Sequence, residues 1–141
     1  MNVSKLCDIE LTYTSLESLD YEPGGQIYGA MEGSVAGERL SGTIRLTNLA
    51  VRRPDNVNLP TLRGVLTTET GQTAWVELDG VATLRASDQA RVIAARCIFR
   101  TGSAELRWLN SAFVVYEGVL DRVAVGGSAR GALHVCEVTV A

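Results

Sequence analysis

The chain has 141 residues, of which 46% are hydrophobic and 21% charged, and its formal net charge is −3. This length and composition predict a single globular domain over residues 1–141 and exclude disordered, collagen-like and coiled-coil chains. No basic run could neutralise several phosphates in succession, so we expect no nucleic-acid partner. No long apolar stretch and no signal-peptide pattern is present, so we expect a cytoplasmic protein without a membrane partner.

Scarce residue types restrict the chemistry further. Three widely spaced cysteines without a CxxC motif (Cys7, Cys97 and Cys136) predict buried, reduced thiols rather than a disulfide framework or a zinc ribbon. A Schiff base would have to use the single lysine, Lys5, and a catalytic triad the single histidine, His134. A multi-histidine metal site is impossible. We therefore expect neither a metal nor a cofactor.

Two-residue alternation of apolar and polar side chains recurs along the whole chain, which predicts an all-β fold. The first predicted strand, Leu6–Tyr13, alternates almost strictly. A polar loop, Ser15–Gly25, is expected next, followed by a glycine-punctuated strand, Gln26–Gly37. The segment Arg39–Arg53 then runs to a turn at Pro54, since proline fixes φ and cannot continue a central strand.

The second half of the chain begins with a predicted hairpin. Strands Leu62–Thr68 and Thr73–Arg85 flank the loop Glu69–Gln72, whose length and glycine are typical of a hairpin connection. Another strand, Arg91–Thr101, follows. The stretch Glu105–Asn110 fits either a helical turn or the start of the next strand.

That next strand is Ser111–Leu120, and Ala132–Val140 is predicted to close the sheet. About eight strands with short connections and no covering helices must hide their edges, and a barrel does so completely. We therefore predict a single antiparallel β-barrel, with a two-sheet sandwich as the alternative. Outward rows of Val and Ile would leave apolar patches, so we expect a homo-oligomer, most simply a homodimer.

Four groups of motifs follow one another along the chain: Gly37-Glu38-Arg39-Leu40-Ser41-Gly42, Arg53-Pro54-Asp55, Arg63 with Thr68-Glu69-Thr70-Gly71, and Phe99-Arg100-Thr101 with Arg107-Trp108-Leu109-Asn110. In this order they resemble the motifs of the bacterial domain-of-unknown-function family 3237. The resemblance covers roughly residues 24–138 and implies a single antiparallel barrel, similar in outline to the allene oxide cyclase and dirigent barrels. The tryptophan often found before the family's RPDG turn is missing here, and the hairpin reads TETG where the family has TDDG.

Candidate catalytic residues lie on two neighbouring predicted strands. Trp75, Glu77 and Asp79 share one face of their strand and aliphatic residues the other, and either face could point inward. Inside a barrel beside Trp75, Glu77 would have a raised pKa and could act as a general acid or base. Alternatively, Glu77 and Asp79 face solvent. Arg100 would stabilise a substrate oxyanion, unless it and Arg96 are surface arginines covering apolar area with their stems.

Together with Trp75, other side chains could shape a substrate pocket. Trp108 and Asn110 point the same way in an extended segment, although Asn110 could instead bond nearby backbone in a turn. Tyr28 and Tyr116 lie in apolar strands, where a tyrosine is most often a core residue with its hydroxyl at the rim. His134 alternates with apolar residues and is more often packed than catalytic in such a position.

These residues favour an enzyme without a cofactor, of the isomerase, cyclase or lyase type. It would enclose a carbonyl-bearing or aromatic metabolite in the barrel and act by proton transfer and substrate positioning. The first alternative is a barrel that binds or carries a small molecule without changing it. The second is a structural subunit whose barrel is filled by side chains.

Overall fold

The computed structural model describes residues 1–140. They form ten strands and one short 3-10 helix, η1 (Arg107–Ser111). No helix in this part of the chain has the length and apolar character needed to cross a membrane. The strands are β1 (Asn2–Asp20), β2 (Gly25–Ala36), β3 (Gly42–Asn48), β4 (Val51–Arg52), β5 (Asn58–Leu59), β6 (Thr61–Thr68), β7 (Thr73–Leu84), β8 (Arg91–Arg100), β9 (Phe113–Leu120) and β10 (Ser128–Glu137).

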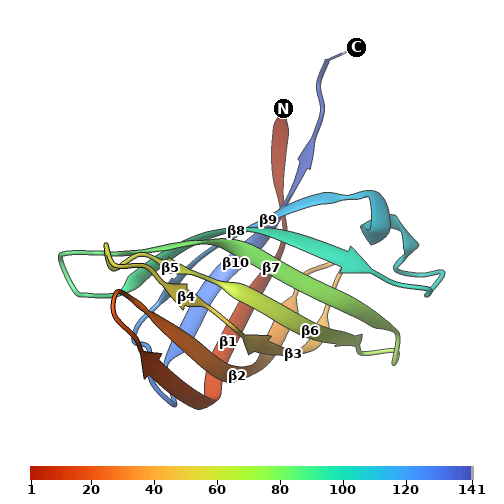
Figure 1. Ribbon diagram of the computed structural model, residues 1–141. Helices are drawn as coiled ribbons and strands as arrows, with labels where there is room; N and C mark the ends of the chain where they lie inside the picture. Colours follow the sequence, from red (N-terminus) through yellow and green to blue (C-terminus); the bar gives the residue numbers. More distant parts are fainter. Residues whose placement is uncertain (141) are drawn as a thin grey trace.

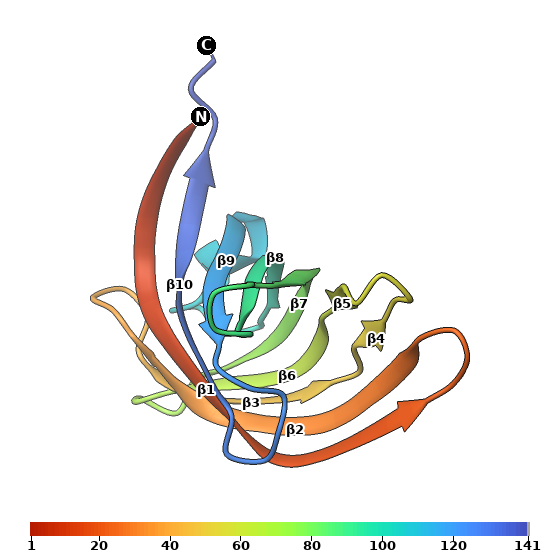
Figure 2. The same cartoon turned by 90° about the vertical axis from the view of Figure 1, so that its left-hand side faces the viewer.

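The eight long strands close into one antiparallel barrel (Figures 1 and 2). Around the barrel the order is β1, β10, β9, β8, β7, β6, β3 and β2, and β2 pairs with β1 again. The short strands β4 and β5 bridge β2 and β7 across the rim, above β3 and β6. The predicted barrel of about eight strands is therefore confirmed, and the sandwich alternative is wrong.

Strict alternation sends every second side chain into the barrel, as a pleated strand requires. On β7 the inward set is Ala74, Val76 and Leu78, all buried, while Trp75 and its outward neighbours contact solvent. The predicted hairpin between β6 and β7 is present, and Gly71 takes a positive φ of 82° in its turn, a conformation that L side chains rarely adopt.

One end of the barrel is sealed by leucines. Helix η1 follows β8 and lies over this end, where it inserts Leu109 into the core. The other leucines of this plug come from the start of β1, the β2–β3 loop, β6 and the approach to η1, and all are buried: Leu6, Leu40, Leu66 and Leu106. We therefore expect a ligand to enter from the opposite end, where β4 and β5 lie.

Two expected element boundaries are wrong. Residues 15–20 were expected in a loop, but β1 continues to Asp20 after a bulge between Tyr13 and Ser15. This extension pairs with β2 alone, because the pairing with β10 ends at Thr12. The last strand lies a few residues earlier than expected, at Ser128–Glu137.

Candidate ligand site inside the barrel

The predicted catalytic pair, Glu77 and Arg100, lies together on the outer face of the barrel. Trp75 Nε1 donates a hydrogen bond of 2.8 Å to Glu77 Oε2, and Arg100 Nη1 donates to the same oxygen. Arg63 Nε lies 3.7 Å from the other carboxylate oxygen and also pairs with Asp79. The structure thus brings these residues together as expected, but the prediction that they face a ligand inside the barrel is wrong.

The pKa of Glu77 is lowered, not raised. The main causes are the hydrogen bonds from Trp75 and Arg100, which favour the ionised form. A carboxylate held in this way is a poor general base near neutrality. The alternative interpretation, in which Glu77 and Asp79 point outward and the aliphatic face fills the barrel, is confirmed.

The predicted pocket residues Trp108 and Asn110 lie on η1, outside the lumen. Arg39 stacks over the Trp108 ring with its Cζ 3.9 Å from the ring centroid. Asn110 accepts a 2.8 Å hydrogen bond from the Thr101 amide and donates one of 2.9 Å to the Thr101 carbonyl. Asn110 therefore bonds nearby backbone at this end of the barrel, as the alternative interpretation predicts.

Tyr28 and His134 also lie on the outer surface. Tyr28 is 56% exposed, so the expectation that it lines a pocket is wrong. His134 is half-buried on the outer face of β10, where its Nε2 lies 3.3 Å from Glu117 Oε2 on β9. Neither side chain lines the interior cavity.

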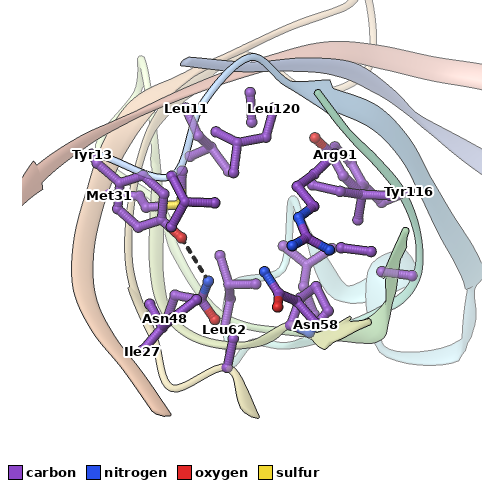
Figure 3. Close-up of a pocket in the computed structure, with 18 residues that line it drawn as sticks. Leu11, Tyr13, Ile27, Met31, Asn48, Asn58, Leu62, Arg91, Tyr116 and Leu120 are labelled. Carbon is purple, nitrogen blue, oxygen red and sulfur yellow. Dashed lines mark hydrogen bonds between the residues drawn. The ribbon is translucent and has the colours of Figure 1, made fainter. Parts of the chain in front are cut away.

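A cavity of about 40 Å³ lies inside the barrel at the end opposite η1 (Figure 3). A cavity of this volume holds one or a few water molecules. Side chains at the rim must therefore move before an organic ligand can bind. Most of the lining is apolar: Leu11, Ile27, Met31, Ala50, Pro60, Leu62, Leu78, Ala82, Ile93, Ala95, Leu120, Val123 and Ala129.

Five polar or amphipathic side chains interrupt this apolar lining, each from a different strand. They are Tyr13 on β1, Asn48 on β3, Asn58 on β5, Arg91 on β8 and Tyr116 on β9. Asn48 Nδ2 donates a 2.8 Å hydrogen bond to the Tyr13 hydroxyl, and its Oδ1 accepts one of 3.2 Å from the Thr61 amide. This pair is therefore internally satisfied, and Figure 3 shows it across the lumen from Arg91.

Arg91 is the most unusual member of the lining, because it is a cation with only 8% of its surface exposed. Its Nη1 donates to the Asn56 carbonyl at 2.5 Å and its Nη2 to Asn56 Oδ1 at 3.0 Å. Both acceptors are neutral. Burial lowers the pKa of Arg91, and the nearby Arg52 guanidinium lowers it further.

One further group in the lining lacks a hydrogen-bond partner within residues 1–140. Asn58 is 5% exposed, and its Oδ1 accepts no hydrogen bond. Buried polar groups are rarely left unpaired, which makes this oxygen available to a ligand. Burial raises the pKa of Tyr116 to about 12, so its hydroxyl remains protonated at neutral pH and can donate a hydrogen bond.

Arg91 and Asn58 were not among the residues expected from the sequence, although strand alternation could have found Arg91. Arg91 shares its strand parity with Ile93 and Ala95, which is the inward face of β8. No alternation pattern marks Asn58, because it lies on the two-residue strand β5, which is brought to the lumen by its pairing with β7 at the rim.

Among residues 1–140, no group of three or more His, Cys, Asp or Glu side chains is arranged to hold a metal.

Solved structures share this fold over nearly the whole chain. A conserved protein of unknown function from Rhodopseudomonas palustris is 16% identical, with a TM-score of 0.80 over 95% of this chain and 96% of that one. A β-barrel-like protein from Acinetobacter baumannii is 14% identical, with a TM-score of 0.81 over 96% of each chain. An enzyme from Penicillium herquei is 20% identical, with a TM-score of 0.66 over 94% of this chain and 93% of that one.

No family model matches the sequence, and no curated protein matches it either. At these identities the likeness to solved structures establishes the fold alone. The chain is therefore an eight-stranded antiparallel β-barrel, similar in fold to an enzyme, a β-barrel-like protein and a protein of unknown function.

Proposed function

We propose that this barrel encloses a small, mostly apolar metabolite with a carbonyl or aromatic group and acts on it without a cofactor. The reaction would be an isomerisation, a cyclisation, or an addition and elimination. The observation that carries this proposal is the interior cavity, in which the unpaired Asn58 oxygen, the buried Arg91 and the Tyr116 side chain interrupt an apolar lining. Pockets that bind small molecules commonly combine apolar walls with a few placed polar groups.

Tyr116 and Arg91 replace the outward-facing Glu77 and Arg100 in this proposal. The protonated Tyr116 hydroxyl would donate a hydrogen bond to a substrate carbonyl. Arg91 would stabilise negative charge that develops on a substrate oxygen, an effect that is strong where water is excluded. The apolar walls would hold the flexible part of the substrate in a reactive conformation.

The Penicillium herquei neighbour supports catalysis in a barrel of this shape, because it is described as an enzyme. We also propose membership of family 3237, on the order of the motifs that run from Gly37 to Asn110.

A carrier without catalytic activity is the second candidate. It is favoured by one specific observation, namely that no Asp, Glu or His is among the residues that line the described cavity. Removal of a proton from carbon normally requires such a base. A reaction in this cavity would therefore depend on polarising a carbonyl and positioning the substrate.

The interior site is tested by filling it. Ala95 lines the cavity, whereas its neighbour Ala94 points outward on the same strand. Acetophenone, a neutral aromatic ketone, serves as the probe, and binding is measured by NMR chemical-shift changes. We expect wild type and Ala94→Leu to bind the probe and Ala95→Leu to lose binding. Equal binding by all three proteins would place the probe outside the barrel.

Recovery of the natural ligand then distinguishes an enzyme from a carrier. Freshly purified protein is examined by native mass spectrometry, and any retained molecule is released and incubated with fresh protein in D₂O. An enzyme would return an altered molecule, deuterated wherever the reaction adds a solvent proton to carbon, and Tyr116→Phe would slow this conversion. A carrier would return the molecule unchanged.

A further inference from the structure

We propose that the ligand of the interior cavity is a monoanion, a mostly apolar molecule whose single carboxylate-like oxyanion binds to Arg91. This inference rests on the proposed interior site and adds the chemistry of the group bound at its rim. It further assigns a hydroxyl group beside the oxyanion, which would donate to Asn58.

The first argument is the uncompensated charge of Arg91. No carboxylate among residues 1–140 lies within ion-pair distance of this guanidinium, although eight other ion pairs of Lys or Arg with Asp or Glu are formed. The charged group that affects the pKa of Arg91 is another cation, Arg52, which itself forms an ion pair with Asp20. A buried charge is costly unless it is paired. An oxyanion in the cavity would supply the missing partner.

The second argument is the number of donors that Arg91 has left. A guanidinium carries five N–H groups in a planar fork that fits a carboxylate. The bonds to the Asn56 carbonyl and to Asn56 Oδ1 use one N–H each, so three remain. Asn56 therefore fixes the guanidinium at the rim while leaving it able to bind a ligand.

Asn58 provides an independent observation at the same place. Its Oδ1 is buried without a donor, and it lines the same cavity as Arg91. Figure 3 shows the two side chains next to one another on one side of the lumen. A ligand hydroxyl would satisfy this acceptor, so the bound group presents an oxyanion to Arg91 and a donor to Asn58.

The remaining lining residues indicate the chemistry of the rest of the ligand. Beyond the rim the walls are aliphatic, with the protonated Tyr116 hydroxyl as a further donor. A second negative charge would have no cation there, because Arg91 is the only Lys or Arg among the described residues that line the cavity. A cationic ligand would be repelled. One oxyanion on an apolar body fits all of these conditions.

The test compares two probes of nearly the same shape, benzoate and acetophenone, which differ in having a charged oxygen or a methyl group. Affinities are measured by isothermal titration calorimetry. Because hydrogen bonds to charged groups are worth more than those to neutral ones, we expect benzoate to bind wild type about tenfold or more tightly than acetophenone. 3-Hydroxybenzoate should bind more tightly than benzoate, because its hydroxyl would donate to Asn58. Asn58→Leu should abolish this difference between the two ligands while leaving benzoate affinity unchanged.

Variants identify the cation responsible. Arg91→Met should reduce benzoate affinity about tenfold or more while leaving acetophenone affinity within about twofold, and Arg91→Lys should retain part of the preference. Arg96→Met is the matched control, because Arg96 lies on the same strand but points outward. It should leave both affinities unchanged.

The outcomes separate this inference from the function on which it rests. If acetophenone binds and is lost in Ala95→Leu, but benzoate binds no more tightly, the cavity is a ligand site and the anion inference is wrong. The same conclusion follows if Arg91→Met keeps the full preference for benzoate. If neither probe responds to Ala95→Leu, the interior site itself is wrong.

Discussion

At the scale of single residues, the barrel interior holds one fully formed polar pair. The Asn48 amide donates to the Tyr13 hydroxyl at 2.8 Å, and both side chains are buried. Burial raises the pKa of Tyr13, with the bond to Asn48 acting in the opposite direction. The pair joins β1 to β3 beside the cavity, so it contributes to stability and also shapes the lumen.

Removing the hydroxyl should destabilise the protein. Tyr13→Phe would leave the buried Asn48 Nδ2 without its acceptor, which typically costs about 1–3 kcal/mol. Denaturant unfolding of the wild type and the variant measures this difference. Tyr28→Phe is the control, because Tyr28 is exposed. Its free energy of unfolding should stay within about 0.5 kcal/mol of the wild-type value. Equal stability of the two variants would mean that water replaces the lost partner.

At the scale of elements, η1 acts as the plug of the sealed end. Leu109 is 1% exposed inside the core, whereas Arg107 on the same helix is exposed. Leu109→Ala should lower the free energy of unfolding by about 2–5 kcal/mol, because it opens a cavity among the plug leucines. Arg107→Ala should change it by less than about 0.5 kcal/mol. A small effect of Leu109→Ala would show that the barrel closes without this helix.

Three strands are joined on the outside by the ion-pair group of Arg63, Glu77 and Arg100. Because the folded-state pKa of Glu77 lies below its ordinary value near 4.5, the ionised form stabilises the fold. This contribution is fully present above the ordinary pKa and is lost as the pH falls through the lowered value.

Glu77→Gln should therefore lower the melting temperature at neutral pH and lose that effect in acid. The comparison is made by recording Tm for wild type and variant from pH 7 down to the acid limit of folding. We expect the difference in Tm to shrink once the pH falls below about 4.5. Turnover of an interior ligand should not change, because Glu77 lies outside the barrel. A constant Tm difference at all pH values would contradict the assigned pKa shift.

The elements also show how far the sequence predicts this molecule. Alternation identified the long strands and the β6–β7 hairpin, because one face of each strand is buried and the other wet. It missed the end of β1, since residues 15–20 pair with β2 alone and have no alternating buried face. It also did not show which face of β7 points inward, because the outer face holds Trp75 and a half-buried Glu77.

At the scale of the whole molecule, closure of the barrel leaves a mixed outer surface. On β7, β8 and β9 the apolar side chains Val81, Val92, Ala94 and Val119 lie on neighbouring outward positions. Val81 and Val92 are exposed, and both come from strands whose inward faces fill the core. We propose this patch as the surface on which two copies of the chain would pack in the expected homodimer.

We therefore expect self-association to depend on this patch. Val92→Glu places a charge at its centre and should convert a dimer into a monomer in sedimentation velocity, since desolvating an unpaired charge in an interface is unfavourable. Val125→Glu is the control, because Val125 is also an exposed valine but lies in the β9–β10 loop, outside the patch. It should leave the dimer intact. A wild-type protein that sediments as a monomer at all concentrations would refute the dimer, and the patch would then be only the solvent face of the barrel.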